Sequence, residues 1–335
     1  MLKVATRGRG VTLVLLLALV GCGHRRAITL DGTLEADAPV CSPVPTCSAP
    51  AWIEDRPAGT EIYFTAIWGS GPCDVFAVGS GGTIVHHDGQ RWSTMASPTS
   101  QTLIDIWGTG PRSVFAVGAA GTVVHYDGSS WTAMNSGTSE DLRGVSGFAP
   151  GGVLVVGQAG TILLYQGQQS WSSLGAGTSQ NLNAIWTVLG KAYAVGDAGT
   201  MLQGDGQSWT RVDTKGLLSD LSSVWGSGPR DIYAVGTHGI ILRSYDGEAW
   251  NSTYAAPPLK YLNAVWGSSA SDVFVVGSNE IGMSLDTILH YDGHSWRAMN
   301  TGSHVPNNDV WGSGPQDVFF ARFDGSVLRY TCRPH

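Results

Sequence analysis

The carboxylates are the residues of this sequence with the most obvious capacity for chemistry. The chain of 335 residues contains 20 Asp and 6 Glu, and glycoside hydrolases use a pair of carboxylates as acid and as nucleophile or base. Nine of the Asp, however, recur at two equivalent places of a repeated motif. Four follow a Gly-Ser-Gly-Pro type of turn and five stand in an Asp-Gly hairpin, namely Asp74, Asp231, Asp272 and Asp317, then Asp88, Asp127, Asp205, Asp246 and Asp292. Asp in such turns bonds its own backbone, so these nine are expected to be structural.

The histidines could in principle bind a metal. His86, His125 and His290 share one position of the repeat, but metal ligands must converge on one ion, and these three lie in different copies. We therefore expect solvated polar positions here, with no metal and no cofactor. The sequence also lacks the Gly-x-Ser-x-Gly, His-Glu-x-x-His and P-loop motifs, so it predicts no coherent catalytic set.

Cys22 closes an N-terminal segment that is typical of exported proteins. A basic start precedes residues 11–20, which are apolar except for one Thr and too few to span a bilayer. The sequence Leu19-Val20-Gly21-Cys22 resembles a bacterial lipobox, which implies diacylglycerol on the Cys22 sulfur, cleavage before it and acylation of the new amino terminus. Several acyl chains anchor a protein stably. Gly23 in place of Asp implies the outer membrane, and an ordinary signal peptide with an incidental Cys is the alternative.

Three regions follow from this pattern. We assign a lipoprotein signal peptide to 1–22, a Pro-containing tether to 23–50 and a repeat domain to 51–335. The tether lacks sustained periodicity and carries Pro where strands would not tolerate it. The formal net charge is -7, and no long basic run exists beyond the first 26 residues. Because nucleic-acid binding needs clustered Lys and Arg, we expect no nucleic-acid partner.

A repeat of about 40 residues organises the third region. Two copies read IWGSGPCDVFAVG from Ile67 and IWGTGPRSVFAVG from Ile106, and seven copies have their first-column position at 68, 107, 146, 186, 225, 266 and 311. Six of these positions are Trp, and Ser146 replaces the seventh. A second Trp column follows a turn in each copy, and Trp52, which precedes the first copy, supplies the member that the last copy lacks. All 13 Trp are then assigned.

Each copy is read as four short strands. In the second copy we expect the first strand at 103–106 and the third at 122–126, with the second between them and rich in β-branched and aromatic residues. An Asp-Gly hairpin then leads to the fourth strand, which the second-column Trp opens. Four strands in about 40 residues, repeated radially, are typical of a β-propeller blade. The sequence therefore predicts an all-β, seven-bladed β-propeller whose N-terminal strand, around Trp52, closes the last blade.

The repeat alignment also bears on the cysteines. Cys332 falls three residues before the absent second-column Trp of the last copy, and Cys47 falls five residues before Trp52. Both belong to the same hairpin end of the last blade, so we predict a Cys47–Cys332 disulfide, worth about 4–5 kcal/mol in the chain-entropy model. Cys41 has three alternatives: pairing with Cys73, a small loop with Cys47, or a free thiol. A zinc site is a weaker alternative because no CxxC pair occurs.

Irregular loops break the symmetry of the repeat. The last complete copy carries a longer connection between its second and third strands, and the connections after Trp209 and Trp250 are also irregular. In a four-stranded blade these loops emerge on one face, and loops on a rigid scaffold often carry binding residues. We name a possible binding rim from its polar and aromatic members, Asp213, Lys215, Tyr254, Lys260, Glu280 and Asp286. Ordinary variation of surface loops is the alternative.

The repeat resembles those of a large set of myxobacterial exported proteins and lipoproteins. The pattern WGSGPxDVFAVG…GTIxHYDGxxW covers residues 52–331, and those proteins resemble BNR/sialidase-like, Kelch-like and photosystem-assembly-factor-type propellers. The third and fourth copies depart from the pattern at the first turn, which affects turn detail. The Asp-Gly-x-x-Trp segment resembles the Asp-box of sialidase-type propellers, although it is one residue shorter. The Asp-box is structural in that family.

The resemblance and the absence of a catalytic set lead to one functional hypothesis and two alternatives. We expect an envelope-anchored lipoprotein with a non-catalytic propeller that binds or scaffolds an unknown protein or carbohydrate partner. The first alternative is a sialidase-like glycoside hydrolase, although the Arg trio and the Tyr–Glu pair of that family cannot be assigned here. The second is a component of adhesion or pilus assembly, which the sequence does not separate from the main hypothesis.

Overall fold

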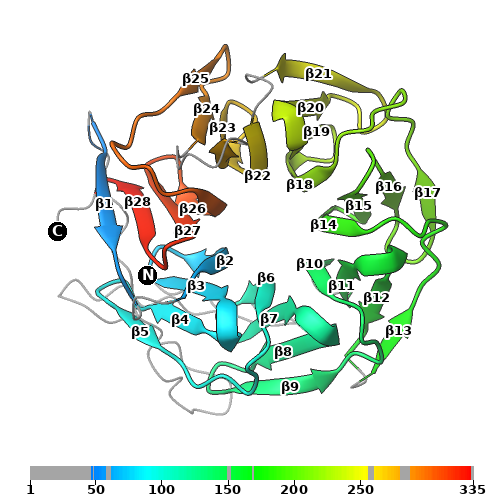
Figure 1. The fold of residues 1–335 in the computed structure, drawn as a ribbon, viewed down its shortest axis with the longest axis horizontal. Helices are drawn as coiled ribbons and strands as arrows, with labels where there is room; N and C mark the ends of the chain where they lie inside the picture. Colours follow the sequence, from blue (N-terminus) through cyan, green and yellow to red (C-terminus); the bar gives the residue numbers. More distant parts are fainter. Residues whose placement is uncertain are drawn as a thin grey trace, which may run out of the picture. The chain divides into compact units, whose positions relative to one another are not determined.

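Seven four-stranded antiparallel sheets make up one unit of the chain, Pro43–His335, and Figure 1 shows them arranged radially around one centre. In six sheets, four consecutive strands follow one another from the inner to the outer edge. The seventh has the order β1-β28-β27-β26, so its outer strand comes from the other end of the unit. The predicted seven-bladed β-propeller, closed by an N-terminal strand, is confirmed.

The computed structural model describes residues 47, 49–57, 62–148, 152–167, 170–255, 260–279 and 287–332. Cys22, Cys41, Glu280 and Asp286 lie outside this set, as does the side chain of Tyr254. None of the described residues belongs to a helix that is long and apolar enough to cross a membrane.

The inner two strands of each blade are the longest, and we number the blades 1 to 7 by their inner strands. The inner strands are β2 (Phe64–Gly71), β6 (Leu103–Gly110), β10 (Leu142–Phe148), β14 (Leu182–Val188), β18 (Leu221–Gly228), β22 (Lys260–Ser269) and β26 (Asn307–Gly314). The second strands are β3 (Asp74–Gly79), β7 (Ser113–Gly118), β11 (Gly152–Gly157), β15 (Lys191–Gly196), β19 (Asp231–Gly236), β23 (Asp272–Asn279) and β27 (Asp317–Arg322). The inner strand of blade 2 runs four residues beyond the predicted 103–106, because Gly110 still pairs with Ser113 across the turn.

The outer two strands are shorter, except that the outermost strand of blade 5 is as long as β19. The third strands are β4 (Ile84–His87), β8 (Thr122–Tyr126), β12 (Ile162–Tyr165), β16 (Met201–Gly204), β20 (Ile240–Ser244), β24 (Thr287–Tyr291) and β28 (Val327–Thr331). The outermost strands are β5 (Trp92–Thr94), β9 (Trp131–Asn135), β13 (Trp171–Ser173), β17 (Trp209–Arg211), β21 (Trp250–Ala255), β25 (Trp296–Ala298) and β1 (Ala51–Asp55). A second-column Trp opens six of these seven strands, as predicted, and Trp52 is the second residue of β1.

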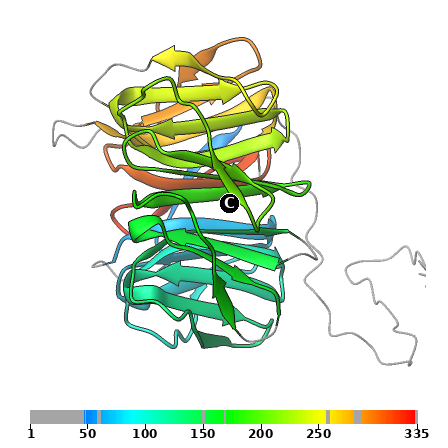
Figure 2. The same cartoon turned by 90° about the vertical axis from the view of Figure 1, so that its right-hand side faces the viewer.

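The core lies between neighbouring blades rather than at the centre of the ring. The second strands are almost continuously apolar and buried, because both of their faces pack against an adjacent blade. Between blades 1 and 2, for example, Phe76 and Val78 of β3 cluster with Ile106 and Val114 of blade 2. Viewed from the side, the strands run from one face of the ring to the other (Figure 2). The inner strand of each blade therefore lines the centre of the ring.

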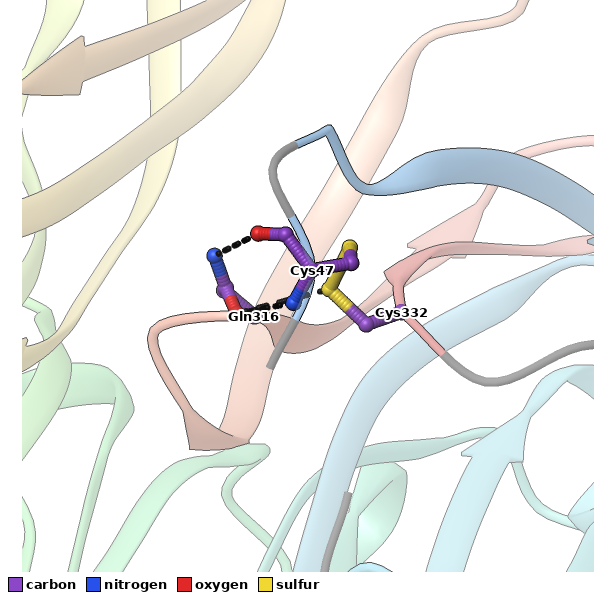
Figure 3. Close-up of a disulfide and its surroundings, with 3 residues drawn as sticks. All are labelled: Cys47, Gln316 and Cys332. Carbon is purple, nitrogen blue, oxygen red and sulfur yellow. Dashed lines mark hydrogen bonds between the residues drawn. A yellow bond between two sulfur atoms is a disulfide. The ribbon is translucent and has the colours of Figure 1, made fainter. Parts of the chain in front are cut away.

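The closing blade is fastened at both ends of β1. At the hairpin end the structure contains the predicted Cys47–Cys332 disulfide, with Cα atoms 5.6 Å apart. The Gln316 side chain lies beside it (Figure 3) and donates to the Cys47 carbonyl at 3.1 Å. At the other end, Arg322 is fully buried and pairs with Glu54 of β1 at 2.8 Å. Cys73 is also disulfide-bonded, and its partner lies outside the described residues.

Candidate functional site

A cavity of about 550 Å³ lies at the centre of the ring, enclosed by the inner strands of all seven blades. Its volume falls in the range of sites that hold small ligands. We call it the channel. Its wall changes character along the strands, because in five of the seven inner strands a polar side chain near the start is followed three residues later by a Trp, with Ile104 and Ser146 as the exceptions. The two parts of the wall have different structural origins.

The first part of the wall is produced by β-bulges. In every inner strand the register to the second strand shifts by one residue at the same place, between Phe64 and Ala66 in blade 1. A bulge leaves one residue unpaired and re-aims its side chain. The seven bulged residues line the channel, and we call them the belt: Thr65, Ile104, Arg143, Asn183, Ser222, Asn263 and Asn308.

Belt side chains join neighbouring blades by hydrogen bonds. Thr65 donates to the Leu103 carbonyl at 2.6 Å, across the seam between blades 1 and 2. The same kind of bond crosses other seams, from Asn183 to the Leu221 carbonyl at 3.0 Å, from Asn263 to the Asn307 carbonyl at 3.0 Å and from Asn308 to the Phe64 carbonyl at 2.6 Å. The belt thus satisfies inner-strand carbonyls that face the channel, where they would otherwise depend on water.

Two carboxylates stand one residue after the belt. Asp105 accepts the backbone N–H of Ile106 at 2.8 Å and that of Val145, in blade 3, at 2.7 Å. Asp309 does the same in blade 7, accepting the N–H groups of Val310 at 2.8 Å and of Ile67 in blade 1 at 2.9 Å. In the other blades this position is Ala, Gly or Ser. The two Asp therefore fasten the seams between blades 2 and 3 and between blades 7 and 1.

The channel shifts the pKa values of both carboxylates upward. Burial raises the pKa of Asp105 to about 7, and the charge of Asp309 adds to this rise. Burial raises the pKa of Asp309 to about 6. The backbone N–H groups oppose both shifts because they favour the ionised form. Both side chains remain partly open to channel water, so each can change its protonation and each can meet a ligand.

The aromatic part of the wall is the first Trp column, which we call the tryptophan ring: Trp68, Trp107, Trp186, Trp225, Trp266 and Trp311. Each indole reaches over the glycine that follows the first-column position in the next blade. A Cβ added to Gly108 would lie 2.7 Å from the Cη2 atom of Trp68, and one added to Gly226 would lie 2.8 Å from that of Trp186. Glycine is therefore required under each indole. The tryptophans themselves are half-buried, so part of each indole faces the channel.

The tryptophan ring is open at one seam, between blades 3 and 4. Ser146 stands in the Trp position there, and Thr187 stands in the Gly position of the next blade. Their hydroxyl groups are 2.9 Å apart, and Thr187 donates to the Gly147 carbonyl at 2.7 Å. A small polar pair thus replaces a large aromatic contact, and we call this place the gap. It is bounded by Trp107 and Trp186, the nearest members of the ring.

The described members of the predicted rim lie outside the channel and make local contacts, and Lys260 opens β22 rather than lying in a loop. Asp213 accepts the backbone N–H of Lys215 at 2.8 Å, which stabilises the turn. The ammonium group of Lys215 lies 3.4 Å from Asn251, and that of Lys260 lies 3.2 Å from Thr287. Glu280, Asp286 and the Tyr254 side chain fall outside the description, so the rim stays a prediction.

Two expectations about the repeated Asp and His residues need correction. In blade 1, Ser70 donates to Asp74, and the other oxygen of Asp74 lies 2.7 Å from His86, whose ring lies against that of Phe76 at a tilted angle. These Asp therefore bridge strands through side chains instead of bonding their own backbone, and His86 is half-buried rather than solvated. Blade 6 repeats the arrangement, with His290 2.7 Å from Asp272. The hairpin Asp do bond their own backbone, as predicted.

The Ser, Asp and His of these clusters do not form a hydrolase triad. In a triad the His lies between Ser and Asp and takes the Ser proton, whereas here the Asp lies between the other two. In blades 5 and 7, Arg243 and Arg329 occupy the His position and bind the equivalent Asp. Among the described residues that line the channel, Arg143 is the one arginine, so the channel wall does not supply the Arg trio of sialidases. No group of three metal-ligating residues occurs within the described ranges.

Comparisons with known proteins agree with the fold. No model of a known protein family matches the chain, and no curated protein sequence matches it. Among solved structures it is similar to "YCF48 bound to D1 peptide", with a TM-score of 0.68 and 14% identity over 86% of this chain and 97% of that one. YCF48 from Cyanidioschyzon merolae gives a TM-score of 0.66, with 16% identity over 84% and 99% of the two chains.

Enzymes share this architecture as well. A catalytically inactive virginiamycin B lyase from Staphylococcus aureus, in a structure with Quinupristin, has a TM-score of 0.74 with 11% identity, over 84% of this chain and 99% of that one. The WD40 repeats of RRP9 give a TM-score of 0.66 with 9% identity, over 85% of this chain and 99% of that one. At such identities the similarity shows the propeller fold alone, and a function has to be argued from the channel.

Proposed function

We propose that this chain is an envelope-anchored lipoprotein whose propeller binds a protein partner at the channel, without catalysing a reaction. The observation that carries the proposal is the channel itself, a cavity of about 550 Å³ whose Trp and polar lining is asymmetric at the gap and at the two carboxylates. A binding or scaffold role is the kind of function that the propeller fold supports. The neighbour that is bound to a D1 peptide is one example of a propeller with a protein ligand.

The position at which the described chain joins the propeller supports a binding face on the opposite side. Cys47 and Gln316 place the start of the unit at the hairpin end of blade 7. The belt lies near the opposite ends of the inner strands. This arrangement suits a module that presents a binding site to a partner.

Anchoring is tested by changing Cys22. In the cells that produce the protein, Cys22→Ala should abolish incorporation of labelled fatty acid and move the protein from the membrane fraction to the soluble fraction. Cys73→Ala is a matched control, because it removes a different cysteine and should leave labelling intact. Unchanged labelling of the Cys22→Ala protein would contradict the lipoprotein assignment.

Partner binding is tested by site-specific photocrosslinking in intact cells. A crosslinker at Ser222 or Asn263 of the belt should capture a defined protein, and one at Ser129, in an exposed hairpin at the other end of blade 2, should not. Equal capture from both faces would contradict a binding site at the channel. Turnover of a glycan panel that is lost on changing Asp286 or Asp105 would instead favour the glycoside hydrolase.

A further inference from the structure

The channel has an unbalanced charge. Asp105, Arg143 and Asp309 are the ionisable residues among those that line it, so two carboxylates face one guanidinium group. Arg143 donates to the side-chain oxygen of Asn183 at 2.8 Å, in the belt. Each carboxylate oxygen, in contrast, receives a single backbone N–H bond. Because an ionised carboxylate can accept about four hydrogen bonds, each Asp keeps acceptor capacity for a ligand.

The two carboxylates act on each other. The charge of Asp309 contributes to the raised pKa of Asp105, which means that the two groups repel each other within the same cavity. A positive charge placed between them would relieve this repulsion and would gain attraction from both, in surroundings where water screens charges less than at the surface. The formal net charge of the whole chain, -7, acts in the same direction by attracting cations to the ring.

The tryptophan ring adds a second feature that suits a cation. Six half-buried indoles surround the channel, and Trp is the aromatic side chain that best attracts ammonium and guanidinium groups through its π face. Asp105 and Trp107 are two residues apart on β6, and Asp309 and Trp311 are two residues apart on β26. Each carboxylate therefore stands beside an indole of its own strand, and the alkyl part of a Lys or Arg side chain could pack against the same rings.

We propose that the channel binds a Lys or Arg side chain presented by the partner protein, held by Asp105 and Asp309 and surrounded by the tryptophan ring. This inference rests on the proposed function and specifies the chemistry of the recognised segment. The cavity volume is sufficient for one long side chain and part of the peptide that carries it. The gap at Ser146 leaves one side of the ring free of aromatic bulk.

The test uses the purified full chain with three synthetic peptides of one design, acetyl-Gly-X-Gly-amide with X as lysine, norleucine or glutamate. Norleucine keeps the alkyl chain of lysine and lacks its charge. We expect the lysine peptide to quench Trp fluorescence saturably and to bind at least tenfold more tightly than the norleucine peptide. The glutamate peptide should not bind. Equal binding of the lysine and norleucine peptides, or no binding of the lysine peptide, would overturn the inference.

Variants separate a charge effect from a folding effect. Asp105→Asn with Asp309→Asn should weaken binding of the lysine peptide at least tenfold, whereas Asp127→Asn, in an exposed hairpin, should leave it unchanged. Arg143→Met removes the opposing charge and should strengthen binding severalfold, a gain that a damaged fold would not produce. Affinity should also fall from pH 8 to pH 5 as the two Asp become protonated, while Arg143 and the peptide stay charged. An affinity that stays the same after these substitutions and across this pH range would overturn the inference.

The outcome remains distinguishable from failure of the proposed function. Crosslinking from the belt identifies a protein partner whatever its charge. If a partner is captured there but the lysine peptide does not bind, the channel is a protein-binding site for a different chemistry. If the lysine peptide binds as expected but no partner is captured, the charge inference stands and the proposed cellular function fails.

Discussion

The seam between blades 7 and 1 and the seam between blades 3 and 4 use different side chains for the same purpose. At the seam between blades 7 and 1, Trp311 covers Gly69, and Asn308 and Asp309 both reach blade 1. At the other seam the Trp and Gly are replaced by Ser146 and Thr187. The seam between blades 7 and 1 therefore combines an aromatic contact with hydrogen bonds, whereas the seam between blades 3 and 4 is joined by hydrogen bonds, including the one from Arg143 to Asn183.

Blade 7 needs additional fastening because its outer strand comes from the other end of the unit, whereas the gap is a place where the Trp–Gly contact of the repeat is absent. In blade 7 the backbone does not run on from β28 into the outer strand β1. The strand β1 is instead held by the disulfide, by the Arg322–Glu54 pair and by its ladder with β28. The gap lies between two blades that are each built from four consecutive strands, so neither of them needs such a fastening. A departure from the repeat is tolerated there, and it gives the channel a side without an indole.

The largest effect is expected from loosening the attachment of β1 to β28 within blade 7. Cys332→Ser removes a bridge that spans 285 residues of sequence, and the chain-entropy model assigns such a bridge about 4–5 kcal/mol. We expect the free energy of unfolding to fall by up to that amount in non-reducing buffer, measured by urea denaturation. In reducing buffer the variant and the parent protein should unfold alike, because both then lack this bridge. A difference that persists under reduction would mean that Cys332 acts through something other than the disulfide.

The next effect concerns the gap and takes the form of a double-mutant cycle. Ser146→Trp alone should destabilise the protein by about 1–3 kcal/mol, because the new indole would meet the Thr187 side chain where the other seams have glycine. Thr187→Gly alone loses the hydroxyl contacts and should also destabilise. The two changes together restore the contact of the other six seams, so the double variant should be more stable than the sum of the single changes predicts. Simple additivity, measured by thermal unfolding, would contradict this account of the gap.

A smaller effect tests whether each indole of the tryptophan ring requires glycine beneath it, an arrangement that is absent at the gap. Gly226→Ala places a Cβ 2.8 Å from the Cη2 atom of Trp186 and 2.6 Å from the Asp231 carbonyl oxygen. We expect a loss of about 1–2 kcal/mol in the free energy of unfolding, since overpacking forces neighbours to move. Gly228→Ala is the matched control two residues along β18, where nothing lies within 4 Å of the added Cβ. Equal stability of the two variants would mean that the indole does not require glycine beneath it.

The sequence predicted the closure of the ring but not the channel. Two Trp columns were enough to place Trp52 in the last blade and to bring Cys47 and Cys332 to one end, because the repeat fixes their position. The belt could not be predicted, because a β-bulge is a property of the register between two strands and no single residue type indicates it. Asp105 and Asp309 had a signal, as the two acids in a column of Ala, Gly and Ser. Ser146 and Thr187 were each visible as departures, but their contact joins two copies and needed the structure.

The smallest effect concerns pH and compares the two channel carboxylates with His87, which packs against Phe319 of blade 7. The raised pKa values of Asp105 and Asp309 mean that the folded state binds protons more tightly than the unfolded state does, so their contribution to stability is lost as pH rises through about 6 and 7. His87 acts in the opposite sense over an overlapping pH range, because burial lowers its pKa to about 4, so its contribution to stability rises between about pH 4 and pH 6.5. We expect the contribution of the two Asp to the free energy of unfolding to decline between about pH 4, the ordinary pKa of Asp, and pH 7, by on the order of 1 kcal/mol, since channel water screens both carboxylates. Asp105→Asn with Asp309→Asn should remove that decline and leave the rise from His87, whereas His87→Gln should remove the rise and leave the decline. A decline that survives in the double Asn variant would assign the titration to groups outside the channel.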